Sequence, residues 1–368
     1  MFQHHHLVNP WFRNLFGFDE FDRSGADISQ SYRLVQQKLK LEPGDVSDQL
    51  VSTVNGKMYL AGKFVETSLA QLRDQVQPVL LINKERVIKY SHLVVSDIFE
   101  LHAVKPQACF QVASQFNALE FPSPSYTPED GVTGYVNDPT QGPACSLACA
   151  AATVVRNYFV TRGKDHQLNT LAELEHCLLE TSADDGKKRQ QRPYWEVKNG
   201  YLFSTREDLD RLNQLFTNLD REHLLGKVHV GWHSCTQVTF ASRDWKPLEH
   251  YHPPILVSQV FCSAIPCAYN HGIPILAWKH LAQLVLDAAY EATLLCAYLE
   301  KQHGSGTGEV FLTFLGGGVF GNEPEWIANA IARAIHRWSV LDLQVQICYR
   351  GRVDPNLSKR IDHALRIL

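Results

Sequence analysis

The sequence lacks an apolar run long enough to cross a bilayer, and it lacks a strong excess of charge of either sign. Its 35 Lys and Arg residues nearly balance 39 Asp and Glu residues, for a formal net charge of −4 at pH 7. This balance gives no electrostatic basis for nucleic acid or an anionic membrane as the main partner. The start, MFQHHHLVNPWFRNLF, has neither the basic region nor the continuous apolar region of a signal peptide. We therefore expect a cytoplasmic protein with no membrane partner.

Metal and redox motifs are also missing. The nine cysteines are an odd number and are scattered through apolar segments, whereas a secreted chain would more often pair them. Cys145 and Cys149 stand one helical turn apart and could form a metal or redox pair, but no CxxC motif, matching histidine pair or second cluster accompanies them. Buried, reduced thiols are the alternative that we favour. We expect no metal and no cofactor.

The composition is otherwise that of an ordinary globular protein, with 45% hydrophobic and 20% charged residues. From about residue 108 onward, predicted strands alternate with predicted helices. This alternation indicates an α/β fold, with helices on both faces of a central sheet that is mixed rather than purely parallel. We predict an N-terminal α+β extension over residues 1–100, docked on a core domain over residues 101–368.

Local signals place several elements. Asn-Gly pairs at 55–56 and 199–200 each stand between β-rich segments and predict hairpins. Pro143 is expected to begin a helix of small residues, ACSLACAAATVVRNYF, because proline suits the first helical position. Ser204 begins a capping-box pattern before another helix.

A glycine-rich segment is the first candidate site. Gly316, Gly317 and Gly318 follow an apolar strand and precede a helix that begins near Pro324. Glycines let backbone N–H groups approach a ligand, and a helix N-terminus favours phosphate oxygens. No Lys-Ser/Thr pair follows, which argues against a P-loop, and no acidic residue supports a dinucleotide motif. We predict a phosphate site, with a plain structural turn as the alternative.

Three segments of the chain resemble a known family. GGGVFGN after a strand resembles the diphosphate loop of macrodomains, and FQVASQFNALE stands where macrodomains carry their first loop. Together with GVTGYVNDPTQGPACSLACA, these segments resemble the divergent macrodomain group that includes the Legionella effector MavL, which is similar in fold to poly(ADP-ribose) glycohydrolase. The resemblance covers most of the chain from about residue 100. Glycines in place of the usual hydroxyl residues, and Asn322 in place of an aromatic residue, depart from the pattern.

The resemblance implies a macrodomain-like fold that binds ADP-ribose and removes it from modified protein, through arginine and with ubiquitin among the possible substrates. A secreted effector of this kind would act in the host cytosol. Gly317, Gly318 and Val319 would present backbone donors to the diphosphate, and Phe320 would pack on the ribose. Further polar contacts to adenine or ribose are expected from the first loop and from Asn270. The full predicted ligand-binding set is Gly316, Gly317, Gly318, Val319, Phe320, Gly321, Asn322, Gln111, Ser114, Asn117 and Asn270.

Hydrolysis at ribose C1 requires carboxyl groups, because the transition state has oxocarbenium character and the leaving group needs a proton. Glu120, Asp130 and Asp138 occupy one proline-rich loop and are the candidate catalytic residues. Asp138 is the strongest candidate, since it stands directly before the segment that leads into the next helix. Solvated loop acids are the alternative for each of them. A catalytically silent ADP-ribose reader and an unrelated, metal-dependent nucleotide hydrolase remain open as functions.

Overall fold

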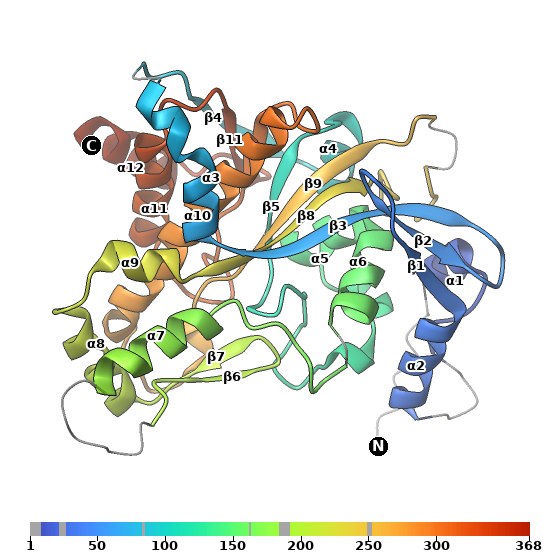
Figure 1. Cartoon of the computed structure of the whole chain (residues 1–368), viewed down its shortest axis with the longest axis horizontal. Helices are drawn as coiled ribbons and strands as arrows, with labels where there is room; N and C mark the ends of the chain where they lie inside the picture. The colour runs from blue at the N-terminus through green and yellow to red at the C-terminus, as the bar shows by residue number, and fades with distance from the viewer. Residues whose placement is uncertain (1–8, 22–26, 83–84, 162, 184–191, 249–251) are drawn as a thin grey trace.

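The computed structural model describes residues 9–21, 27–82, 85–161, 163–183, 192–248 and 252–368 (Figure 1). Its centre is a nine-stranded sheet in the order β1-β2-β3-β8-β9-β5-β10-β11-β4. The strands are β1 (Leu39–Glu42), β2 (Asp48–Ser52), β3 (Met58–Ser68), β4 (Lys89–Val95), β5 (Cys109–Ala113), β8 (His229–Gln237), β9 (Leu256–Cys262), β10 (Glu309–Leu312) and β11 (Gln344–Arg350). A separate two-stranded hairpin joins β6 (Glu196–Lys198) to β7 (Tyr201–Phe203).

The large sheet is mixed. The pairs β9–β5, β5–β10, β10–β11 and β11–β4 are parallel, whereas β1–β2, β2–β3, β3–β8 and β8–β9 are antiparallel. Because β5 and β10 pair in parallel, with Cys109 opposite Val310, the loops that follow these two strands leave the sheet at the same edge. Ligands of open α/β sheets bind at that edge.

Helices cover both faces of the sheet, as Figure 1 shows. One face carries α3 (Leu69–Ile82), α9 (Arg221–Gly226), α10 (Lys279–Gln302), α11 (Pro324–Arg337) and α12 (Pro355–Ile367). The other carries α4 (Ile98–Val104), α5 (Gln141–Ala148) and α6 (Ala150–Val155). Around the periphery lie α1 (Trp11–Phe16), α2 (Ile28–Lys38), α7 (Ala172–Ala183) and α8 (Arg206–Phe216). The predicted three-layer arrangement around a mixed sheet is confirmed.

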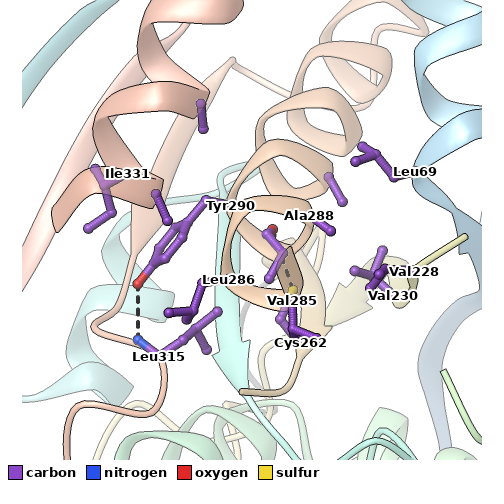
Figure 2. Packing of buried hydrophobic residues seen from close by; sticks show 14 of the residues in the cluster. Leu69, Val228, Val230, Cys262, Val285, Leu286, Ala288, Tyr290, Leu315 and Ile331 are labelled. Carbon is purple, nitrogen blue, oxygen red and sulfur yellow. Dashed lines mark hydrogen bonds between the residues drawn. The ribbon is translucent and has the colours of Figure 1, made fainter. Parts of the chain in front are cut away.

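Successive side chains of each strand point to opposite faces of the sheet, so the hydrophobic core is divided between the two faces. Cys109 packs into the cluster around α10, while its neighbour Phe110 stacks on Phe311 in the cluster next to α6. Figure 2 shows the α10 face, where Val285 and Ala288 meet side chains from the strands and Leu69 from α3. The small residues of α10 and α11 let these helices lie close to the sheet and to each other.

The first hundred residues, predicted as a docked extension, supply strands to both edges of the same sheet. Strand β3 pairs with β8 over six residues, and β4 pairs with β11 over seven. The two segments that we separated at residue 100 therefore share one sheet. Strand β4 could be placed at the far edge only through its pairing with β11, which sequence periodicity does not reveal.

The local predictions were mostly confirmed. Both Asn-Gly hairpins form, as β2–β3 and β6–β7. Two helix starts differ from expectation. Helix α5 begins at Gln141 rather than Pro143, which lies in its first turn, where no backbone N–H needs a helical acceptor. Helix α8 is capped by Thr205 rather than Ser204, since the Thr205 side chain accepts from the N–H of Asp208.

Helix α10 ends with a buried carboxyl group. Glu300 is 2% exposed, and its Oε1 accepts a hydrogen bond from Trp232 Nε1 at 2.5 Å. Burial raises the pKa of Glu300 to about 7, against hydrogen bonds from Ser258 and Trp232 that lower it. The folded state therefore keeps a proton that the unfolded chain releases at lower pH.

The substitution Glu300→Gln is expected to make the stability less dependent on pH. Since the folded pKa lies above the ordinary value, the stabilisation from this proton is lost as pH rises through about 7. The variant keeps the acceptor for Trp232 and should be more stable than wild type at pH 8 by roughly 1–3 kcal/mol. Urea unfolding of both proteins at pH 5 and pH 8 measures the difference. Equal pH slopes for the two proteins would contradict this role for Glu300.

Candidate functional site

A cavity opens at the sheet edge where β5 and β10 end. We call it the central cavity. It is lined by residues that follow β5, by the start of α5, by residues after β9 and by the glycine-rich segment after β10. The lining residues are Ala113, Ser114, Gln115, Glu120, Phe121, Pro122, Asp138, Thr140, Gln141, Gly142, Pro143, Tyr201, Cys262, Ala264, Tyr269, Thr313, Phe314, Leu315, Gly316, Gly318, Val319 and Phe320.

The glycine loop (residues 313–323) connects β10 to α11 and is fixed at its start by α10. The hydroxyl group of Tyr290 donates to the carbonyl of Thr313 at 2.7 Å and accepts from the N–H of Leu315 at 3.0 Å, as Figure 2 shows for Leu315. The loop then closes on itself, because the N–H of Asn322 donates to the carbonyl of Gly316 at 2.9 Å. These bonds hold the backbone in place without a ligand.

Two glycines of this loop, Gly316 and Gly318, have different surroundings. Gly316 has a φ of +71°, and a Cβ there would lie 2.6 Å from the Cβ of Ala264, so the backbone itself requires glycine. Gly318 lines the central cavity, and a Cβ built on it meets nothing within 4 Å. Gly318 is exposed, so a side chain at this position would have open space beside the cavity.

Three successive backbone amides of the loop are available as donors. Among the described residues, the N–H groups of Gly318, Val319 and Phe320 donate to no acceptor. All three residues line the central cavity. Helix α11 begins directly afterwards at Pro324 and adds the partial positive charge of its N-terminus. Consecutive free amides before a helix form a binding site for an anion such as phosphate.

Aromatic rings form one wall beside these amides. The ring of Phe320 lies 5.7 Å, centre to centre, from both Tyr201 and Tyr269. Tyr201 and Tyr269 also line the cavity, and they belong to the β6–β7 hairpin and to the turn after β9. The predicted packing role of Phe320 beside a sugar is compatible with this wall, and Val319 projects outward with 65% of its surface exposed.

Glu120 is the buried carboxyl group of the site. Arg156 Nη2 lies 3.2 Å from its Oε1 and 3.1 Å from its Oε2. Burial raises the pKa of Glu120 to about 7, while Arg156, Ser146 and Tyr135 lower it. Glu120 can therefore carry a proton near neutral pH, which an exposed glutamate cannot do.

Arg156 was not predicted as part of the site. It is 1% exposed, lies in a π-helical turn (Arg156–Val160) after α6, and stacks 3.6 Å from the centre of the Phe261 ring. Its Nη2 also donates to Ser146 Oγ at 2.9 Å. The signal was available in the sequence, because a single arginine ends a long run of small and apolar residues, and a buried arginine requires an acidic partner.

Asp138 is the second carboxyl group of the central cavity. Its Oδ1 accepts from the N–H of Thr140 at 2.8 Å, and among the described residues its Oδ2 has no hydrogen-bond partner. The predicted residue Asp130 lies elsewhere: its Oδ2 accepts from both the N–H and the hydroxyl of Thr127, and it does not line the central cavity. The central cavity thus brings together Glu120 and Asp138 but not Asp130.

A second pocket continues from the central cavity past these two acids. This acid-loop pocket is named for the acid loop (residues 120–138) that forms most of it. It shares Glu120, Phe121, Pro122 and Asp138 with the central cavity. Its other lining residues are Asn9, Phe21, Tyr126, Asp130, Gly131, Thr133, Gly134, Tyr135, Val136, Asn137 and Pro139. It therefore combines three carboxyl groups with aromatic rings.

A third pocket adjoins the central cavity where β4, β10 and β11 end. This edge pocket shares Thr140, Gln141 and Thr313 with the central cavity. Asp97, which caps α4, lines it together with Arg350 from the end of β11. Sequence reasoning missed this pocket because the position of β4 in the sheet was not predicted. The edge pocket also shares Pro139 with the acid-loop pocket, so the three pockets adjoin one another.

Four predicted contact residues are occupied in holding the loops. Gln111 accepts from the N–H of Thr313 at 3.2 Å, and Asn117 accepts from the N–H of Leu119 at 3.1 Å. The other two are Asn270, which accepts from Ser204 N, and Asn322, which donates to the carbonyl of Ile265. None of these four lines the central cavity, and neither do Gly317 and Gly321. The N–H of Gly317, predicted as a diphosphate donor, donates to the carbonyl of Phe314 at 3.2 Å instead. For Gln111 and Asn117 the geometry favours a role in capping the loop backbone. Ser114 does line the cavity.

From the sequence we expected no membrane-spanning segment and no metal site anywhere in the chain. The structure can be compared with these expectations over the described residues. No helix there is long and apolar enough to span a membrane. No group of three or more His, Cys, Asp or Glu residues in the described ranges is arranged to hold a metal ion. All nine cysteines are free thiols, and most of them are buried.

Comparison with known proteins gives structural matches only. No family model matches the chain, and no curated protein matches it. Solved structures with a similar chain path include the following two. Poly(ADP-ribose) glycohydrolase from Deinococcus radiodurans in complex with ADP-ribose has 12% identity and a TM-score of 0.40, covering 83% of this chain and 94% of its own. The enzyme from Thermomonospora curvata, bound to the inhibitor ADP-HPD, has 12% identity and a TM-score of 0.41, covering 93% and 97%. Values this low carry no argument about function.

Proposed function

We propose that this protein is an ADP-ribosylhydrolase that binds the diphosphate of ADP-ribose on the glycine loop. The observation that carries the proposal is the series of three free amides, Gly318 to Phe320, in the same cavity as Glu120 and Asp138. Hydrolysis of an ADP-ribosyl bond requires donors that bind the phosphates and carboxyl groups that act at ribose C1, and this cavity has both. The macrodomain resemblance of GGGVFGN supports ADP-ribose as the ligand.

The three adjoining pockets suggest how ADP-ribose would lie. With the diphosphate on the glycine loop, the terminal ribose would pack on Phe320 with its C1 toward Glu120 and Asp138. The adenosine half would occupy the edge pocket, which joins the central cavity at Thr313. The leaving group would occupy the acid-loop pocket. An elongated ligand would thus use all three pockets.

Arginine is the linked residue that we propose. The acid-loop pocket has Glu120, Asp130 and Asp138 among its lining residues, and a guanidinium group pairs with carboxylates through two parallel hydrogen bonds. The resemblance to the MavL group supports the same linkage, and with it ubiquitin as a candidate substrate. Asp130 would act in this pocket on the leaving group rather than at ribose C1.

In the proposed reaction, the C1–N bond breaks and water adds its oxygen to C1. Asp138 takes the proton of the attacking water and stabilises the developing positive charge on the ribose. Glu120 supplies the proton that the departing guanidine nitrogen acquires. We assign the proton-donor role to Glu120 because it is buried and keeps a proton near neutral pH. We assign the base role to Asp138 because it is partly exposed and its Oδ2 is free.

The first test is calorimetric titration with ADP-ribose, followed by release of ADP-ribose from ADP-ribosylated arginine peptide. Binding in the micromolar range together with release supports the hydrolase. Binding without release would favour the alternative, an ADP-ribose reader, which needs the glycine loop but not the acids. Failure of the wild-type protein to bind ADP-ribose would reject both functions.

The pH dependence tests the role of Glu120. As the proton donor, Glu120 must be protonated, so kcat/KM is expected to fall as pH rises through about 7. In Glu120→Gln this alkaline limb should disappear and the remaining rate should be roughly 100-fold lower. Glu180→Gln is the control, since Glu180 lies in α7 with an exposed carboxyl group and does not line the central cavity. A wild-type profile that is flat between pH 6 and 8.5 would contradict this role.

A further inference from the structure

The N-terminal segment holds the acid loop through one buried carboxylate. Glu20 follows α1 and is 3% exposed. Its Oε1 accepts from the N–H of Val132 at 2.8 Å, and its Oε2 accepts from the N–H of Thr133 at 2.7 Å. Both amides belong to the acid loop, between Asp130 and Asp138. A side chain distant in sequence thus bonds two consecutive backbone donors beside the proposed site.

The surroundings of Glu20 are built for this contact. Tyr158 also donates its hydroxyl to Glu20 Oε1 at 2.7 Å, in addition to the two backbone donors. Gly131 has a φ of +70°, and a Cβ there would lie 2.6 Å from the carboxyl carbon of Glu20. Glycine at position 131 therefore lets the loop backbone approach the carboxylate closely.

A second contact connects the same segment to the same loop. Ser29, in the first turn of α2, donates to Glu129 Oε2 at 2.6 Å. Asn9 and Phe21 from the N-terminal segment also line the acid-loop pocket. The segment before β1 therefore forms part of the wall of that pocket and fixes the loop that carries Asp130 and Asp138.

We infer that Glu20 is a positioning residue of the active site, which holds the acid loop so that Asp138 faces the ribosyl bond and Asp130 faces the leaving group. This inference rests on the proposed function. Glu20 itself lines neither the central cavity nor the acid-loop pocket, so it acts through the loop backbone and not on the substrate.

The test compares three variants with the wild-type protein. Glu20→Ala removes the acceptor, and Glu20→Gln keeps one carbonyl oxygen but turns an NH₂ group toward a donor. Asp19→Asn is the matched control, because it removes the neighbouring negative charge from a carboxylate that pairs with Arg13. We expect kcat to fall ~10-fold or more in Glu20→Ala and less in Glu20→Gln, with Kd for ADP-ribose within ~2-fold of wild type. The control should match wild type.

Hydrogen exchange of residues 127–138 gives a readout that needs no catalysis. The amides of Val132 and Thr133 should exchange ~10-fold or more faster in Glu20→Ala than in wild type, and unchanged in Asp19→Asn. Unchanged exchange would overturn the inference. Faster exchange with a lower melting temperature but unaltered kcat would also overturn it, because Glu20 would then only stabilise the fold. If wild type releases no ADP-ribose while exchange responds as expected, the proposed function fails and the contact of Glu20 with the loop stands.

Discussion

Replacement of Gly318 by glutamate is expected to abolish ADP-ribose binding. The new side chain would enter the central cavity, since a Cβ at Gly318 meets no atom within 4 Å and the residue lines the cavity. Its carboxylate would stand beside the free amides that are proposed to receive the diphosphate, and it would both fill the space and repel the ligand. We expect Kd to rise ~100-fold or more, which corresponds to the loss of one or two charge-assisted hydrogen bonds.

Two variants at the same position separate the causes of this effect. Gly318→Ala adds a methyl group in open space and should change Kd by no more than about threefold. Gly318→Gln fills the same volume as glutamate without the charge and should fall between the other two. Calorimetric titration gives Kd for each. The melting temperature of all three should stay within about 3 °C of wild type, because no atom is displaced in the folded protein.

Loss of binding in Gly318→Glu with an unchanged melting temperature would support the glycine loop as the diphosphate site. Wild-type affinity in this variant would mean that ADP-ribose binds elsewhere, and the free amides of Val319 and Phe320 would then be features of a turn. A matching loss in Gly318→Ala would indicate that the loop conformation, rather than the cavity space, had changed.

The fold was predictable from the sequence where the signal is local. Alternating strands and helices after residue 108 and the two Asn-Gly turns gave the α/β class and both hairpins, because turn residues and hydrophobic periodicity act over short distances. The positions of β3 and β4 were not predictable, since each pairs with a strand more than 150 residues away. Only the three-dimensional pairing shows that the N-terminal hundred residues supply edge strands of the central sheet.

In the candidate site, too, the local features were predictable and the long-range contacts were not. The glycine loop was predictable because strand, glycines and helix are contiguous, and Glu120 and Asp138 could be identified as acids of one loop. Their partners were not. Arg156 contacts Glu120 across 36 positions, and Glu20 reaches Val132 across 112. Long-range polar contacts of this kind depend on how the loop is folded onto the core, so residue type and spacing along the chain do not specify them.

The largest effect on hydrolysis is expected from Asp138→Asn. The asparagine keeps an oxygen to accept from the N–H of Thr140, so the loop should retain its conformation. The free Oδ2 is replaced by an NH₂ group, which can neither take the proton of the attacking water nor stabilise a positive ribose. We expect kcat for release of ADP-ribose from ADP-ribosylated arginine peptide to fall by ~10²–10⁴-fold, with Kd for ADP-ribose within about threefold of wild type.

Asp130→Asn is the informative comparison for this variant, because it removes the same charge from the same loop. Asp130 lines only the acid-loop pocket, so its effect should appear in KM for the arginine peptide and be much smaller in kcat. An equal loss of kcat in both variants would mean that the negative charge of the loop matters rather than the position of Asp138. Full activity in Asp138→Asn would move the catalytic role to Glu120 alone, because Glu120 is the other carboxyl group that lines the central cavity.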